Sequence, residues 1–193
     1  FVVAETGTLA LIENEGNIRL STSAPRIHVA LVGIEKLLPR FTDLAVFLSL
    51  TARAATGQRL GTFVSLIQGP RQPGEPDGPE EVHVVFVDNG RSSVLADLEA
   101  WETLRCLRCA ACLNACPVYR QTGGHAYGYV YSGPIWAILS PGLFGLEETK
   151  PLPYASSLCG ACFQACPGRI PIPKLLLTWG NRAGQEGVNP TGE

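Results

Sequence analysis

Seven cysteines fall into two groups that share one spacing. They are Cys106, Cys109, Cys112 and Cys116 in the first group, and Cys159, Cys162 and Cys166 in the second. The first group reads C-x2-C-x2-C-x3-C-P, the run in which bacterial ferredoxins hold one [4Fe-4S] cluster with three thiolates and reach a neighbouring cluster with the fourth. The spacing therefore predicts two iron–sulfur clusters.

The second group aligns with the first when its Cys-Pro pair is placed on the first Cys-Pro pair, and Ser156 then occupies the position of Cys106. Three thiolates on a tight turn grip three corners of a cubane, but the fourth cysteine leaves that turn and reaches the other cluster. The crossed pattern assigns Cys106, Cys109, Cys112 and Cys166 to the first cluster, and Cys116, Cys159 and Cys162 to the second. We expect the first to be [4Fe-4S]. For the second, the sequence leaves open a [4Fe-4S] cluster capped by Ser156 or water, or a [3Fe-4S] cluster.

Two other uses of cysteine fit this spacing less well. Zinc sites usually take four ligands, often as two separated C-x2-C pairs, and a C-x2-C-x2-C triple with a trailing Cys-Pro does not suit a tetrahedral ion. A disulfide framework prefers an even number of cysteines in a short secreted chain, whereas this chain has 7 and a 46% hydrophobic composition. Reduced, cluster-binding cysteines agree better with the pattern.

Composition excludes further classes of function. A net charge of −2 and an isoelectric point near 6.0 provide no basic surface for a phosphate backbone, so we expect no nucleic-acid partner. The longest apolar runs, 28–34 and 134–146, are shorter than the about 20 residues that span a bilayer. We expect a cytoplasmic protein, or one peripheral to the membrane. The chain contains no methionine and opens inside an apolar strand pattern, which predicts a piece of a longer protein.

The residues before the cysteines predict an α/β domain. Breaker-rich residues at Gly69–Pro79 predict a loop, and Thr42 is a candidate N-cap of a helix that ends near Gly57. Buried strands are expected at the first three of five apolar segments, and short strands at the other two. The five segments are Val2–Ala4, Thr8–Ile12, Ile27–Gly33, Thr62–Ile67 and Val82–Val87.

From Val94 the pattern becomes helical and leads directly into Cys106. Leu95, Leu98, Trp101 and Leu104 would share one face of this helix. Pro134 and Pro173 are candidate first residues of two further helices. We therefore expect a domain boundary near Ser92-Ser93. The expected organisation is an α/β domain at 1–93, a mainly helical ferredoxin-like domain with two clusters at 94–183, and a polar tail at 184–193.

Five segments together resemble the lactate-utilisation iron-sulfur protein B family. They are VAETGTLALIENEGN, RIHVALVGIEKLLP, GPRQPGEPDGPEEVHVVFVDNGR, RCLRCAACLNACPVYRQTGGHAYG and SSLCGACFQACP. The resemblance covers most of the chain, from Phe1 to about Leu177. It implies that the first domain is similar to sugar-isomerase and CoA-transferase domains and lacks its start.

The resemblance also implies a function. It suggests an electron-transfer subunit of a cytosolic complex that oxidises L-lactate to pyruvate, with the other subunits and an electron acceptor as partners. The cysteine pattern by itself does not specify lactate, and subunits of other 2-hydroxy-acid or respiratory oxidoreductases carry similar modules. No P-loop, G-x-G-x-x-G or Ser/His/Asp motif is present, so we predict no catalytic residue and a component that carries electrons.

Two alternatives to electron transfer remain open at this point. One is a redox or iron sensor with a labile cluster, although no basic recognition helix is visible. The other is a cluster that only rigidifies the protein, for which one closed cluster would suffice. Arg108, inside the first cysteine loop, is either a solvated charge or a residue that tunes the nearby cluster.

Overall fold

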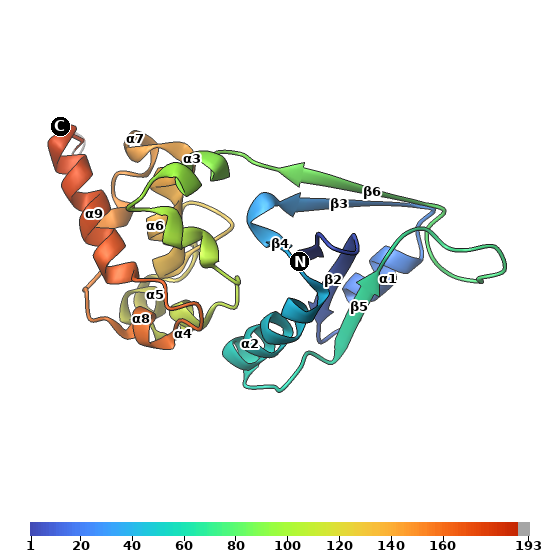
Figure 1. Cartoon of the computed structure of the whole chain (residues 1–193). Helices are drawn as coiled ribbons and strands as arrows, with labels where there is room; N and C mark the ends of the chain where they lie inside the picture. Colours follow the sequence, from blue (N-terminus) through green and yellow to red (C-terminus); the bar gives the residue numbers. More distant parts are fainter. Residues whose placement is uncertain (189–193) are drawn as a thin grey trace. The chain divides into compact units, whose positions relative to one another are not determined.

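A computed structural model describes residues 1–188 and divides the chain into two units, Phe1–Asp88 and Asn89–Glu193. The first unit contains all the strands of the described chain, and the second is helical (Figure 1). This confirms the expected fold class, an α/β region followed by a mainly helical one. Of the polar tail expected at 184–193, residues 189–193 lie outside the described residues.

A four-stranded sheet with the order β4-β1-β2-β5 forms the centre of the first unit. Its strands are β1 (Val2–Val3), β2 (Thr8–Glu13), β4 (Leu37–Leu38) and β5 (Phe63–Ile67). β1 runs parallel to β4 and antiparallel to β2, which also pairs antiparallel with β5. Helix α2 (Leu44–Thr56) covers the sheet and buries Leu44 against Val3, Ala10 and Leu38. The helix ends at Gly57 as expected, because this glycine adopts the left-handed conformation at φ 78°.

Strands β3 (Ile27–Gly33) and β6 (Glu81–Val87) form a separate parallel pair (Figure 1). The prediction that β3 is buried was wrong, because Leu31 is 72% exposed and Val29 is 54% exposed. The pair has no third strand among residues 1–188. Side chains of β3 mostly alternate between exposed and partly buried, and most side chains of β6 are exposed. The polar residues before β3 form a short helix, α1 (Asn17–Ser23), which the apolar pattern did not indicate.

The second unit contains seven α-helices joined by turns and short 3-10 segments within residues 89–188. The helices are α3 (Arg91–Ala96), α4 (Ala111–Ala115), α5 (Pro117–Thr122), α6 (Gly133–Phe144), α7 (Leu146–Thr149), α8 (Ala161–Ala165) and α9 (Ile172–Gln185). Pro134 lies in the first turn of α6 and Pro173 in that of α9, as expected. None of the described helices is long and apolar enough to cross a membrane.

The continuous helix expected from Val94 to Cys106 was wrong. Helix α3 ends at Ala96, and a 3-10 segment at Trp101–Arg105 precedes the first cysteine. The break occurs at Asp97, whose backbone is extended and whose carboxylate accepts hydrogen bonds from the Glu99 N–H and the Arg182 guanidinium. These side-chain hydrogen bonds stabilise a non-helical conformation at Asp97 and compete with continuation of the helix. Leu98 is consequently 89% exposed instead of lying on a buried face.

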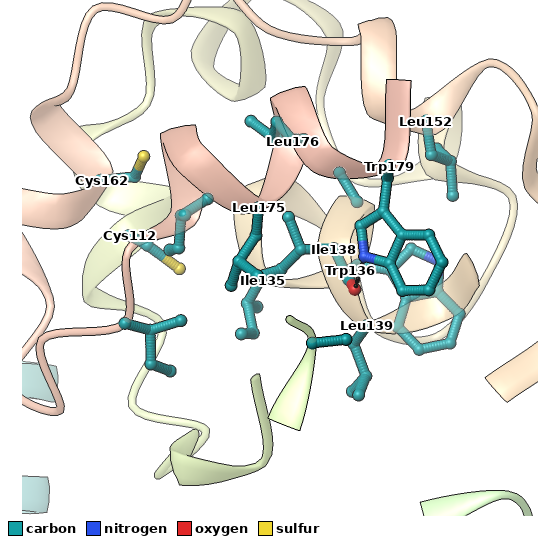
Figure 2. Close-up of a cluster of buried hydrophobic side chains, with 14 of the residues drawn as sticks. Cys112, Ile135, Trp136, Ile138, Leu139, Leu152, Cys162, Leu175, Leu176 and Trp179 are labelled. Atoms are coloured by element: carbon teal, nitrogen blue, oxygen red, sulfur yellow. Dashed lines mark hydrogen bonds between the residues drawn. The ribbon is translucent and has the colours of Figure 1, made fainter. Parts of the chain in front are cut away.

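The core of the second unit lies between α6 and α9 (Figure 2). Helix α6 is apolar on all sides, and Ile138 is 1% exposed. Trp179 of α9 donates its indole N–H to the Ile138 carbonyl at 2.9 Å, so this buried polar group is satisfied. Cys112 and Cys162 belong to the same buried cluster and lie at one end of it (Figure 2). The core therefore contains one cysteine from each group.

Candidate functional site: two cysteine cavities

The two cysteine groups fold into nearly the same loop. Helix α4 follows the first loop and helix α8 follows the second, and each has five residues. Arg108 and Ala110 have left-handed φ values of 63° and 62°, and the aligned Leu158 and Gly160 have 53° and 80°. A non-glycine residue in this conformation is uncommon, and three of these four positions are such residues. The repeat recognised from cysteine spacing is therefore also a repeat of backbone geometry.

Backbone N–H groups point at the sulfurs in both loops. The Ala111 N–H donates to Cys109 Sγ, and in the same way the Ala161 N–H donates to Cys159 Sγ. The Tyr119 N–H donates to Cys116 Sγ at 3.4 Å at the start of α5. Such donors stabilise a charged sulfur and orient it, whether it carries a free negative charge or ligates iron.

The first cavity, of about 160 Å³, is lined by thiols from both groups. These are Cys106, Cys109, Cys112 and Cys166. One water needs only about 10–15 Å³ by this measure, so the cavity has room for a group of atoms much larger than a single ion. No three His, Cys, Asp or Glu side chains in residues 1–188 converge closely enough to hold one metal ion. Four thiols around a wide cavity suit a cluster better than zinc.

The second cavity is lined by the remaining three cysteines, Cys116, Cys159 and Cys162, together with Ser156 and Ser157. It is tighter, about 10 Å³ by the same measure, so a cluster here would require the loop to open. Cys159 is exposed, whereas Cys116 and Cys162 are buried. The donor set suits iron and sulfide chemistry, because it consists of thiols and a hydroxyl.

Electrostatic coupling divides the thiols into the same two sets. Burial raises the pKa of Cys112 to about 12, and the other three thiolates of the first cavity add to this rise. Burial also raises the pKa of Cys162, with a smaller contribution from the other two thiolates of the second cavity. The pKa of the exposed Cys159 is lowered instead, chiefly by the Ala161 N–H and then by the Ser157 hydroxyl. Thiolates within one set repel each other in the free protein. Bound iron would replace the thiol protons and relieve this repulsion.

Charge distinguishes the two cavities. Arg105 and Arg108 line the first cavity, and their guanidinium groups lie over the rings of Trp101 and Tyr131 at 4.5 and 4.2 Å. The aromatic contacts hold both cations near the thiols. No charged side chain lines the second cavity within residues 1–188. Arg108 therefore lies where it can tune a cluster, as one of the two sequence interpretations proposed.

Two residues at the cavities were missed by the sequence analysis. The Ile135 N–H at the start of α6 donates to Cys112, although Ile135 is far from both cysteine groups in sequence. The Ser157 hydroxyl lies near Cys159 and lowers the pKa of its thiol. The position of Ser157 beside Ser156 was visible in the sequence, but nothing in the spacing showed that one serine would face a sulfur.

Comparisons with known proteins match the two units of the chain separately. Residues 1–87 match the LUD domain, and residues 102–170 match the 4Fe-4S dicluster domain. Lactate utilization protein B of Bacillus velezensis is 53% identical over 92% of this chain, and that of Bacillus licheniformis is 50% identical over 100% of it. The chain thus matches members of the lactate utilization protein B family over nearly all of its own length. This confirms the family resemblance inferred from five sequence segments.

The family members that match are longer than this chain. The chain spans 37% of the length of the Bacillus velezensis protein and 40% of that of the Bacillus licheniformis protein. The protein B of Bacillus subtilis, 51% identical over 177 residues, is likewise matched over 37% of its length. Within this chain, the LUD match at residues 1–87 precedes the dicluster match at residues 102–170.

The fit between α6 and α4 provides a test of how the first cavity is positioned. Gly133 begins α6 at φ 71°, and a Cβ there would lie 2.6 Å from Leu113 Cγ. Leu113 belongs to α4 and lines the first cavity beside Cys112. We expect Gly133→Ala in the full-length protein to lower the free energy of unfolding by about 2–3 kcal/mol and to alter the spectrum of the first cluster. Thermal unfolding and paramagnetic resonance would measure the two effects.

A second glycine provides the matched control. Gly128 has φ 70°, but no atom lies within 4 Å of a Cβ built there. Gly128→Ala should show only the cost of the left-handed backbone, about 1 kcal/mol, and leave the cluster spectrum unchanged. Equal effects of the two substitutions on both measurements would mean that the contact with Leu113 does not position the cavity.

Proposed function

We propose that this chain carries electrons through two iron–sulfur clusters, as part of a protein that serves a complex oxidising L-lactate to pyruvate. The observation that supports this most directly is the partition of seven thiols between two cavities. Each cavity takes thiols from both cysteine groups, as the crossed ferredoxin pattern requires. The relatives named for lactate utilisation support the substrate.

We assign Cys106, Cys109, Cys112 and Cys166 to a [4Fe-4S] cluster in the first cavity. Cys116, Cys159 and Cys162 would hold the second cluster. Bound clusters would supply reversible one-electron chemistry. The protein supplies the thiolates, the N–H donors to sulfur and an apolar core that excludes water from Cys112 and Cys162. These are the features by which a protein sets the potential of a cluster.

The two environments also favour different potentials. A nearby cation stabilises the added negative charge of a reduced cluster, and Arg108 at the first cavity supplies such charge. The charge of Arg105 is partly offset, because its guanidinium pairs with Glu102 at 3.0 Å. The uncharged lining of the second cavity offers no equivalent in the described residues. Two clusters of unequal potential can pass an electron in a preferred direction, whereas a cluster with a purely structural role needs no such difference.

The proposed function requires partner subunits, because the sequence contains no motif for a cofactor that accepts hydride. No flavin or nicotinamide motif occurs in the sequence, so another subunit or cofactor would take the two electrons from lactate and pass them on singly. Anaerobically purified full-length protein should therefore show two centres that reduce and reoxidise in a redox titration followed by paramagnetic resonance. It should not oxidise L-lactate with an artificial acceptor unless its partner proteins are added.

Two results would overturn this proposal. Steady lactate turnover by the isolated full-length protein would make it the dehydrogenase itself. Clusters that cannot be reduced at any accessible potential would indicate a structural role. D-lactate and glycolate, tested beside L-lactate in the assembled system, would separate the proposed substrate from other 2-hydroxy acids.

A further inference from the structure

The second cavity contains two side-chain oxygens in addition to its three thiols. Every other side chain that lines it is apolar or a glycine, so only Ser156 and Ser157 offer further atoms that could ligate iron. A cubane has four iron corners, and three thiolates leave one of them without a protein ligand. The choice of fourth ligand therefore lies between the two serines and water.

Ser156 repeats the geometry of a cysteine ligand. In the first loop, the Arg108 N–H donates to Cys106 Sγ at 3.4 Å. In the second loop, the Leu158 N–H donates to Ser156 Oγ at 3.0 Å. Both donors are left-handed residues two positions after the acceptor. The Oγ atom of Ser156 thus lies in its loop where the sulfur of Cys106 lies in the first.

Ser157 is used differently. Its hydroxyl lies near Cys159 and lowers the pKa of that thiol, and the crossed assignment makes Cys159 a ligand of the same cluster. A hydroxyl beside a sulfur ligand tunes that sulfur from outside the cluster. Ser156 is half-buried and Ser157 is exposed, which also favours Ser156 as the group that faces the cluster.

We propose that Ser156 Oγ is the fourth protein ligand of the second cluster, an inference that rests on the two-cluster assignment proposed above. Ligation forms an Fe–O bond and breaks the Ser156 O–H bond, and the proton passes to solvent. No electron is transferred in this step. The Leu158 N–H stabilises the resulting anionic oxygen, as the Arg108 N–H would stabilise the thiolate of Cys106.

The test distinguishes a serine ligand from water by isotope. Full-length protein is purified anaerobically, transferred to oxygen-17-labelled water and reduced, and the electron–nuclear double resonance of each cluster is recorded. We expect no oxygen-17 coupling to the second cluster of the wild-type protein. Ser156→Ala should admit water to that iron and show the coupling, or lose the iron and give a [3Fe-4S] signal. Coupling in the wild-type protein, or a [3Fe-4S] second cluster without air exposure, would overturn the proposal.

A reciprocal pair of substitutions provides the control. Cys106→Ser gives the first cluster a serine ligand, and Ser156→Cys gives the second cluster a cysteine ligand. We expect Cys106→Ser to keep its cluster without oxygen-17 coupling, and Ser156→Cys to make the second cluster at least tenfold slower to degrade in air. If Ser156→Cys changes neither the spectrum nor the rate, Ser156 is not a ligand.

The same measurements test the role of Ser156 separately from the two-cluster assignment. Iron sufficient for only one cluster in the wild-type protein would contradict the two-cluster assignment itself. Two intact clusters, with bound water at the second, would contradict only the role of Ser156.

Discussion

Replacing Cys166 by alanine is expected to remove the cluster of the first cysteine group, although Cys166 belongs to the second group in sequence. Cys166 lines the first cavity with Cys106, Cys109 and Cys112. Removal of one thiolate from four should lower the iron content from about eight to about four atoms per full-length chain, or convert the first cluster to a [3Fe-4S] form. Iron analysis and Mössbauer spectroscopy of anaerobically purified protein would measure this loss.

Reference variants make the identity of the lost cluster unambiguous. In the proposed assignment, Cys109 would bind the first cluster and Cys159 the second whether or not the fourth ligands cross. The spectrum of Cys166→Ala should therefore match that of Cys109→Ala. That of Cys116→Ala should match Cys159→Ala. The opposite pairing would show that each group keeps its own fourth cysteine, and the crossed assignment would then be wrong.

The cysteine loops and several secondary-structure elements could be predicted from the sequence, because they depend on local patterns. The spacing of cysteines fixes how many thiols one turn can present, and the proline after each group ends the loop in a defined way. Strand β2 and helix α2 were likewise indicated by period and by a glycine at the C-cap. These features need no knowledge of the rest of the chain.

Other features depend on contacts between distant residues, which periodicity does not encode. The helix predicted from Val94 breaks because Asp97 pairs with Arg182, a residue of α9. The Ile135 N–H reaches Cys112 only because α6 packs beside α4. The apolar residues of β3 were expected to be buried, but burial depends on what covers a strand rather than on its composition.

The role of Ser156 illustrates the boundary between the two kinds of information. The alignment of cysteines placed this serine at the position of Cys106 but left Ser156, water and a missing iron equally open. The hydrogen bond from the Leu158 N–H, which matches the one made to Cys106, is a geometric fact that spacing alone does not provide. The structure thereby reduces an open choice to one proposed ligand with a spectroscopic test.

Removing iron is expected to unfold much of the second unit while the first unit keeps its structure. All 7 cysteines lie between residues 106 and 166, so the first unit has no ligand to lose. Helices α4 and α8 have five residues each and are too short to persist alone. Cluster binding contributes directly to folding, as structural zinc does with about 10–16 kcal/mol in small domains. We expect the free energy of unfolding of the second unit to fall by at least about 5 kcal/mol.

The distribution of aromatic residues allows the two units to be observed separately. The 3 tryptophans, Trp101, Trp136 and Trp179, and all 5 tyrosines belong to the second unit. Oxidative removal of iron with a chelator should shift tryptophan emission to the red and remove the tryptophan and tyrosine bands from the near-ultraviolet circular dichroism. Amide protons of β1 and β2 should stay protected in hydrogen exchange. Chelator without oxidant is the control and should change neither signal.

The continuity of the core explains why the effect should extend beyond the cysteine loops. Cys112 and Cys162 pack into the same buried cluster as Trp136 and Trp179 (Figure 2). When iron no longer holds these two thiolates in place, one end of that core should become exposed. An unchanged tryptophan emission after complete iron loss would show that α6 and α9 hold the unit without clusters. The cavities would then be sites preformed by the protein, and the clusters would contribute electron transfer but little folding energy.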